Sequence, residues 1–194
     1  MKGRIAAVAA ALVLCACGGA APRIDFYSLT APPAPAAPTA PASTLAIHVG
    51  PVTVPDAVDR PQMVVRLDDN RVDIDDQHRW VEPLKNAVPR LIADSIAREL
   101  NTPNVLTSRQ SSGLEIDYRV AIDVQHFDSS SGEVSEDVLW TIRSRKETQA
   151  PRLGRSAVKE NATGGAEGIA AAHARALQRV AHDIAEAIRS MEGK

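Results

Sequence analysis

Cysteine is nearly absent from this chain of 194 residues, which has only Cys15 and Cys17, one residue apart in the stretch LVLCACGG. A disulfide between them would close a small strained ring and would join nothing distant in the fold. A metal site would need further ligands close by, and no histidine lies within thirty residues of Cys17. The two cysteines therefore do not staple the fold, and the residues around them have to indicate their role.

Aromatic residues and a basic excess are lacking too. The chain has two residues each of Phe, Tyr and Trp, too few for a stacking platform that binds bases or sugars. Without the first sixteen residues, which include Lys2 and Arg4, 178 residues remain, with 20 basic against 24 acidic side chains and a net charge of −4. Nucleic-acid-binding proteins usually carry a basic excess. We therefore expect no nucleic-acid partner, and a length that suits one domain.

The chain also has no long hydrophobic run. A short one lies near its start. Lys2 and Arg4 precede ten apolar residues, Ile5 to Leu14, and small residues follow. A bilayer span needs roughly 20 apolar residues, so this run is too short to cross a membrane. A positive start, a short apolar core and small residues are the layout of a secretory signal.

The stretch from Leu14 to Cys17 resembles a bacterial lipobox, in which an aliphatic residue stands three positions before the acylated cysteine and a small residue directly before it. Cys17 fits this pattern, whereas Cys15 would place the bulky Leu14 at the cleavage step. We therefore expect residues 1–16 to be removed as a signal peptide and Cys17 to carry the covalent lipid, palmitate among its acyl chains. The alternative is a cleaved signal with incidental cysteines.

The residue after Cys17 indicates which of the two membranes holds the lipoprotein. Gly18 follows Cys17, in place of the aspartate that marks inner-membrane retention in many such lipoproteins. We expect a location in the outer membrane, facing the periplasm.

Periodicity predicts an α+β fold. Alternation or β-prone composition indicates strands in the segments 23–30, 44–55 with a kink at Gly50-Pro51, 62–75 with a turn at 68–70, 114–127, 138–148 and 154–163. The segment 128–137 is expected to be a loop. Apolar residues at helical spacing indicate helices from Trp80 to Leu100 and from Ile169 to Met191. We expect one domain with an antiparallel or mixed sheet packed against these two helices.

Patterns typical of catalytic or metal sites are missing. His173 and His182 are nine residues apart on one predicted helix and so point in opposite directions. His173 falls on the apolar stripe, which favours a core or interface histidine. The acidic run DDNRVDIDD lacks the central glycine and the final glutamate of a calcium loop, and no Gly-x-Ser-x-Gly motif occurs. We therefore expect no enzyme, no metal site and no cofactor other than the lipid.

Three stretches together are similar to a known family. They are FYSL at residues 26–29, VGPVTVPDAVDRPQMVVRLDDNRVDIDDQHRWVEPL at 49–84, and AAAHARALQRVAHDIAEAI at 170–188. The chain resembles the ABC-type transport auxiliary lipoproteins, the family that includes paraquat-inducible protein C. The second stretch carries the most specific part of the resemblance.

The resemblance implies an outer-membrane lipoprotein that works with a periplasmic MCE-domain protein and an inner-membrane ABC transporter. Such systems move lipids or other hydrophobic molecules between the two membranes, and members are thought to form homo-oligomeric rings. The resemblance also implies that FYSL is a strand of the domain. The domain then covers residues 25–194, residues 17–24 form the lipidated N-terminus with a short tether, and the Pro/Ala-rich stretch 31–43 is a crossover loop.

The segment from Pro55 to Leu84 is the candidate partner or subunit interface. We expect Arg60, Gln62 and Arg79 to make polar contacts there and Trp80 to be the anchor, because tryptophan is enriched in interface hot spots. The alternative is that Trp80 is a core residue at the start of the helix and that Asp59-Arg60-Pro61 is a rigid turn.

Two other functions stay open from the sequence. A lipoprotein activator of peptidoglycan synthesis would share the anchor and the Pro-rich stretch, but it would need a long tether. A periplasmic hydrolase would need a Ser-His-Asp cluster assembled by the fold.

Overall fold

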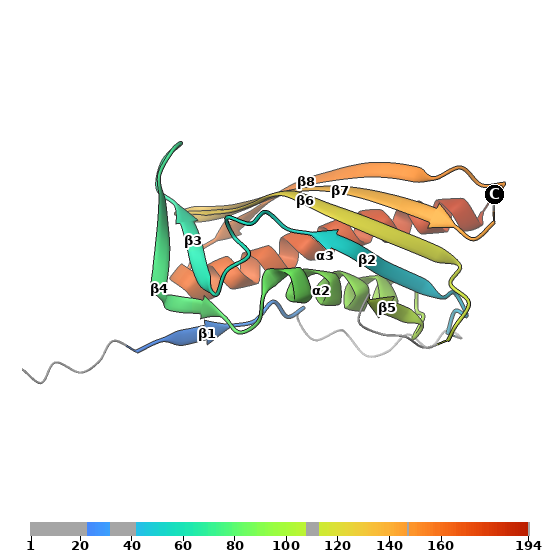
Figure 1. The fold of residues 1–194 in the computed structure, drawn as a ribbon, viewed down its shortest axis with the longest axis horizontal. Coiled ribbons are helices and arrows are strands. Elements are labelled where there is room, and N and C mark those ends of the chain that lie inside the picture. Colours follow the sequence, from blue (N-terminus) through green and yellow to red (C-terminus); the bar gives the residue numbers. More distant parts are fainter. Residues whose placement is uncertain (1–22, 32–41, 108–112, 147, 194) are drawn as a thin grey trace, which may run out of the picture.

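Three long strands form the larger part of a curled mixed sheet (Figure 1). The computed structural model describes residues 23–31, 42–107, 113–146 and 148–193. Within them, β6 (Tyr118–Ser130), β7 (Gly132–Ser144) and β8 (Arg152–Ala162) are antiparallel neighbours. Alternate residues of these strands are buried, as expected for a sheet that has one face covered and one face in water.

The edge of β6 that does not pair with β7 is shared by two groups of strands. Its first half pairs in parallel with β2 (Ile47–Thr53), beyond which lies β5 (Val105–Thr107). Its last residues pair with β3 (Gln62–Arg66), which is followed by β4 (Val72–Trp80) and β1 (Asp25–Tyr27). The kink expected at Gly50-Pro51 is present, because the register of β2 shifts between Val49 and Val52.

We call the hairpin of β3 and β4, residues 62–80, the arm. It stands upright at the end of the molecule opposite the C-terminus, and β1 lies at its base (Figure 1). The predicted turn is confirmed, since the backbone N–H of Leu67 donates to the carbonyl of Arg71 across Asp68, Asp69 and Asn70.

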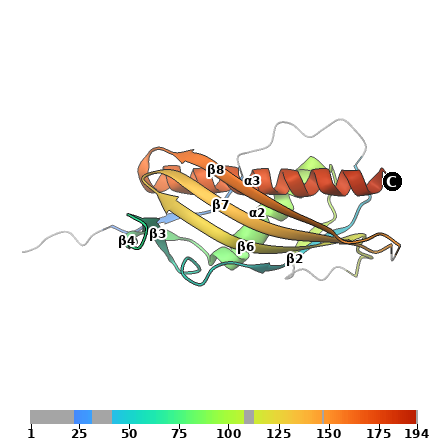
Figure 2. The same cartoon turned by 90° about the horizontal axis from the view of Figure 1, so that it is seen from above.

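Helices α2 (Leu84–Glu99) and α3 (Gly165–Glu192) cover one side of the sheet (Figures 1 and 2). The predicted stripe of α3 is confirmed. All its members are buried: Ile169, His173, Leu177, Val180, Ile184, Ile188 and Met191. Pro83 precedes α2 and Pro89 lies inside it. The α+β class with a mixed sheet is thus confirmed.

Two sequence expectations were wrong. The segment 128–137 is no loop, because β6 and β7 run through it and turn only at Ser131. Its alternation was hidden by polar residues that face inward, Ser129 and Glu136, and by a bulge between Val124 and His126. The helix expected from Trp80 begins four residues later, and Trp80 is instead the last residue of β4.

The N-terminal predictions divide between described and undescribed residues. β1 pairs with β4, and Leu29 is buried, so the FYSL stretch is part of the folded sheet. The signal peptide, Cys17 and most of the loop 31–43 lie outside the described residues. No helix in the described part combines the length and the apolar character that a membrane crossing requires.

The contact between Gly154 and Trp140 gives a stability prediction. A Cβ atom on Gly154 would lie 2.1 Å from Cζ2 of Trp140, whose indole N–H donates to Ser156 Oγ at 3.1 Å. We expect Gly154→Ala to lower the free energy of unfolding by about 1–3 kcal/mol, the usual cost of overpacking, in urea denaturation. Ala157→Ser, on the exposed face of the same strand, should change it by less than about 0.5 kcal/mol. Equal effects of the two changes would contradict this account.

Candidate partner interface

Trp80 lies in the core at the end of β4 and is only 6% exposed. Its ring meets those of Phe127 and His173 edge-on, at centroid distances of 6.3 and 6.2 Å. Phe127 in turn stacks flat on His173 at 3.8 Å. In the single chain the indole is therefore a core group, which favours the core interpretation of Trp80 over the interface anchor.

Gln62 and Arg79 lie directly opposite each other at the base of the arm. Gln62 Nε2 donates to Asp76 Oδ1 at 3.2 Å, and Arg79 Nε donates to the carbonyl oxygen of Asp76 at 3.1 Å. Both side chains thus hold the same turn of β4 from neighbouring strands. The interface role of the two residues stays a prediction.

That turn is a wide irregularity in β4. Residues 76–78 are left out of the ladder with β3, because Gln62 pairs with Arg79 and the next residue of β3 pairs with Asp75. The Asp75 carboxylate accepts hydrogen bonds from the backbone N–H groups of Gln77 and His78 and contacts His78 Nδ1 at 2.7 Å. Burial alone would raise the pKa of Asp75, but these hydrogen bonds outweigh it and lower that pKa. The hydrogen bonds of Asp75 therefore stabilise the irregularity at the base of the arm.

Arg60 lies apart from this pair, in the wall of a cleft of about 280 Å³ beside the arm. The cleft is lined by apolar side chains of the arm and of the 55–58 turn, among them Val58, Val64 and Ile74. Within the described residues, Arg60 Nε is buried and has no hydrogen-bond partner. The four predicted residues therefore lie on neighbouring segments, since the backbone N–H of Trp80 donates to the carbonyl of Pro61 at 2.6 Å, but their side chains have different surroundings. Gln62 and Arg79 are together, Arg60 lines the cleft, and Trp80 is in the core.

Sequence reasoning missed an apolar surface at the base of the arm. Phe26, Val81 and Ile24 are 63%, 59% and 42% exposed, whereas the intervening Tyr27 packs against the core. Alternation within RIDFYSL was the available signal, since it places Ile24 and Phe26 on the side opposite Tyr27.

Sequence reasoning also missed three hydrogen-bonded side chains in the core. His173 Nε2 lies 2.9 Å from Ser129 Oγ, and His173 Nδ1 lies 2.9 Å from Glu136 Oε1. The three residues are 0%, 5% and 1% exposed for His173, Ser129 and Glu136 respectively. Burial raises the pKa of Glu136 well above its usual range and lowers that of His173 to about 3. We infer that both groups are neutral, with the Glu136 carboxyl donating to Nδ1 and the His173 Nε2–H donating to Ser129.

The side chains of Ser129, His173 and Glu136 contact one another in the order of a hydrolytic triad. In this arrangement the three residues cannot act as a triad. A triad histidine accepts the serine proton, whereas in the inferred state His173 Nε2 carries its own proton and donates a hydrogen bond to Ser129 Oγ. All three side chains are also buried, and Phe127 stacks on the imidazole ring. The geometry thus supplies the cluster that the hydrolase alternative required, without the access or the protonation that it needs.

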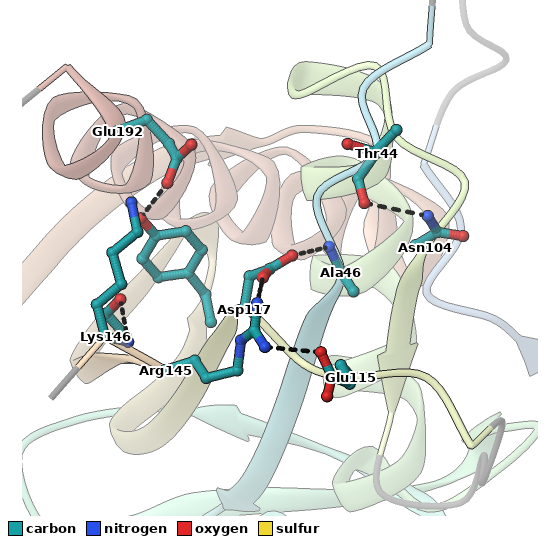
Figure 3. A network of polar contacts seen from close by, with 10 residues as sticks. Thr44, Ala46, Asn104, Glu115, Asp117, Arg145, Lys146 and Glu192 are labelled. Atoms are coloured by element: carbon teal, nitrogen blue, oxygen red, sulfur yellow. Dashed lines mark hydrogen bonds and ion pairs between the residues drawn. The ribbon is translucent and has the colours of Figure 1, made fainter.

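A second polar network closes the far end of the sheet (Figure 3). The Asp117 carboxylate accepts the backbone N–H of Ala46 at 3.0 Å and a guanidinium N–H of Arg145 at 3.3 Å. Tyr118 donates its hydroxyl to Glu192 on α3. Burial, followed by this hydrogen bond, raises the pKa of Tyr118 to about 12. These carboxylates are used as structural acceptors, and in the described part of the chain no three potential ligands gather as a metal site would require.

The buried glutamate gives a pH prediction. A raised pKa in the folded state means that the folded chain holds a proton that the unfolded chain loses above about pH 4.5, so stability falls as pH rises. The lowered pKa of His173 acts oppositely, but only between about 3 and 6.5. Above about pH 6.5, and until the raised pKa of Glu136 is reached, the free energy of unfolding should therefore fall, by at most about 1.4 kcal/mol per pH unit.

Glu136→Gln should remove this fall, because its amide can donate to His173 Nδ1 without taking up a proton. Urea unfolding at several pH values measures the slope. Glu167→Gln, at an exposed glutamate in the first turn of α3, is the control and should keep the wild-type slope. A Glu136→Gln slope equal to that of wild type would refute the neutral buried carboxyl.

Comparison with known proteins agrees with the resemblance found in the sequence. The family described as ABC-type transport auxiliary lipoprotein component matches residues 27–185. No curated protein matches the chain.

Two solved structures share the fold. One is titled as an uncharacterized protein, with 17% identity and a TM-score of 0.68, over 86% of this chain and 99% of the other. The second is protein XCC0632 from Xanthomonas campestris, with 18% identity and a TM-score of 0.62, over 83% of this chain and 92% of the other. At these identities the two structures support the fold alone.

The family match begins in β1, takes in the arm, both helices and the three hydrogen-bonded side chains in the core, and ends in α3. This chain therefore belongs to the family of ABC-type transport auxiliary lipoprotein components.

Proposed function

We propose that this chain is a non-catalytic outer-membrane lipoprotein that docks the periplasmic MCE-domain subunit of an ABC-type system transporting lipids or other hydrophobic molecules between the membranes. Membership of the family gives a lipoprotein of the cell envelope with an auxiliary role in ABC-type transport. The outer membrane, the MCE-domain partner, the hydrophobic cargo and assembly into a homo-oligomeric ring are the proposed parts.

The observation that carries the proposal is the place of β1 in the sheet. Asp25 pairs with His78 and stands eight residues after Cys17, the predicted lipid site. Eight residues reach at most about 29 Å when fully extended. The folded domain is therefore held close to the membrane, as a docking protein requires.

The same observation weighs against the alternative, a lipoprotein activator of peptidoglycan synthesis. Such an activator reaches away from its membrane on a long tether, and the Pro/Ala-rich stretch could serve as one only if the domain began after it. β1 precedes that stretch, and Leu29 is buried. The stretch is therefore attached to the folded domain at both ends and cannot be a tether between the anchor and the domain.

The absence of catalysis is supported by the state of the one triad-like cluster. Ser129 is buried, and in the inferred protonation state its Oγ accepts a hydrogen bond from His173 Nε2–H, so the imidazole has no free lone pair to take the serine proton. Ser129→Ala leaves the buried His173 Nε2–H without its acceptor, so it should lower the free energy of unfolding by about 1–3 kcal/mol in urea denaturation. The variant protein that folds should keep the transport function of the cell.

The arm is the proposed contact with the protein partner. It projects from the body of the domain (Figure 1), and its base carries Gln62 and Arg79 at neighbouring positions. Arg60 lines the adjoining cleft, and its buried Nε has no hydrogen-bond partner among the described residues. Arginine is among the residues enriched in interface hot spots.

A mild-detergent pull-down of the full-length, C-terminally tagged protein tests the function. We expect mass spectrometry to identify an MCE-domain protein in an assembly much heavier than the 20.7 kDa chain. Recovery of a penicillin-binding protein, or of a lone monomer, would overturn the proposal.

The same pull-down tests the arm. The double change Gln62→Ala and Arg79→Glu should reduce recovery of the partner at least about fivefold, as loss of hot-spot contacts does. Arg143→Glu, an exposed charge change at the other end of β7, is the matched control. Gln62 and Arg79 also hold the Asp76 turn, so the melting temperature of both variants is measured as well. A double variant that melts more than about 2 °C below Arg143→Glu would assign its lost recovery to folding. Equal recovery with both variants would exclude the base of the arm as the contact.

A further inference from the structure

An exposed apolar face lies on the strand that leads directly from the predicted lipid anchor. We call Ile24, Phe26 and Val81 the β1 face. Phe26 pairs with Arg79 in the parallel ladder of β1 and β4, and alternation places Val81 on the same side as Arg79. The other side of these strands carries Tyr27 and Trp80, which pack in the core. The three apolar side chains therefore share the outer side of the sheet.

We propose that the β1 face rests in the headgroup region of the bilayer in which the chain is anchored. This inference rests on the proposed acylation of Cys17. Ile24 follows Cys17 by seven residues, which span at most about 25 Å. An acylated cysteine sits at the membrane surface, so β1 is the described element that cannot leave its vicinity. Apolar groups held there gain by entering the boundary between headgroups and acyl chains.

The charges beside the β1 face indicate which kind of lipid surface it meets. Arg23 pairs with Asp25 at 3.0 Å, and Arg79 with Asp76 at 3.8 Å. Both of these arginines thus have a carboxylate beside them. A surface of this kind has no excess of positive charge to attract anionic lipids, so it fits a zwitterionic phospholipid and makes a contact driven by apolar burial.

The orientation agrees with the proposed docking role. β1 lies at the base of the arm, and the tip of the arm points away from β1 and beyond the edge of the sheet (Figure 1). With the β1 face on the membrane, the tip of the arm stands clear of the lipid surface. Because Phe26 pairs with Arg79, the protein contact proposed at the base of the arm lies directly beside the lipid contact of the β1 face.

Fluorescence quenching tests the proposal on the full-length acylated protein in vesicles of zwitterionic phosphatidylcholine with brominated acyl chains. Both native tryptophans are buried, at 6% and 7% exposure, and give a background. Phe26→Trp and, in a separate variant, Val81→Trp place a probe on the face. Leu153→Trp, at a leucine 74% exposed on β8, is the matched control.

We expect each probe on the β1 face to be quenched more than about twofold over the control, because an interfacial side chain sits about 5–10 Å deep. The quenching should persist in about 1 M NaCl, where the Debye length is only about 3 Å. Quenching equal to that of Leu153→Trp would overturn the inference, as would a blue-shifted but unquenched probe, which indicates cover by a second copy of the chain. Quenching lost in salt would overturn the zwitterionic, apolar contact.

Flotation of the vesicles separates this inference from its premise. Protein that floats with the vesicles but shows no quenching contradicts the β1 face alone. Protein whose Cys17→Ala variant floats as well as wild type contradicts the acylation of Cys17, and with it the short anchor on which both proposals depend.

Discussion

A buried hydrogen bond between the side chains of Glu136 and His173 joins the sheet to α3 at the centre of the core. The ring of Phe127 stacks on that imidazole, and Trp80 meets both rings from the end of β4. Four elements, β4, β6, β7 and α3, therefore meet at one polar cluster. A buried polar group is tolerable only when it is hydrogen-bonded, so this cluster fixes how α3 lies on the sheet and where the base of the arm is seated.

The fixed base explains why the arm and β1 work as one unit. β4 runs down the arm, passes the irregularity held by Asp75, and ends at Trp80 in the cluster, where it pairs with β1. The parts of the surface that the account assigns to lipid and to protein thus share one rigid support. Only a few residues separate Cys17 from Asp25, so the proposed acylation of Cys17 would hold the whole unit near the membrane.

Much of this architecture could be predicted from the sequence, because burial leaves a periodic pattern in β6, α2 and α3. The pattern failed where polar side chains turn inward. Ser129 and Glu136 made the β6–β7 hairpin look like a loop, and only the fold shows that His173 satisfies them. His173 itself was predicted correctly as a buried histidine, since it interrupts an apolar stripe. The candidate interface was found only in part, because Gln62 and Arg79 are brought together by pairing between strands, and the exposure of Phe26 depends on which side of β1 the core covers.

The central claim is that the folded domain is held directly beneath its membrane by a short lipid anchor. Neutron reflectometry on a supported bilayer that carries the full-length acylated protein measures the gap between the lipid headgroups and the protein layer. The account predicts protein density that begins at the headgroups, with no water layer between them. A separate protein layer beyond a water gap of more than about 29 Å, the full reach of eight residues, would contradict it.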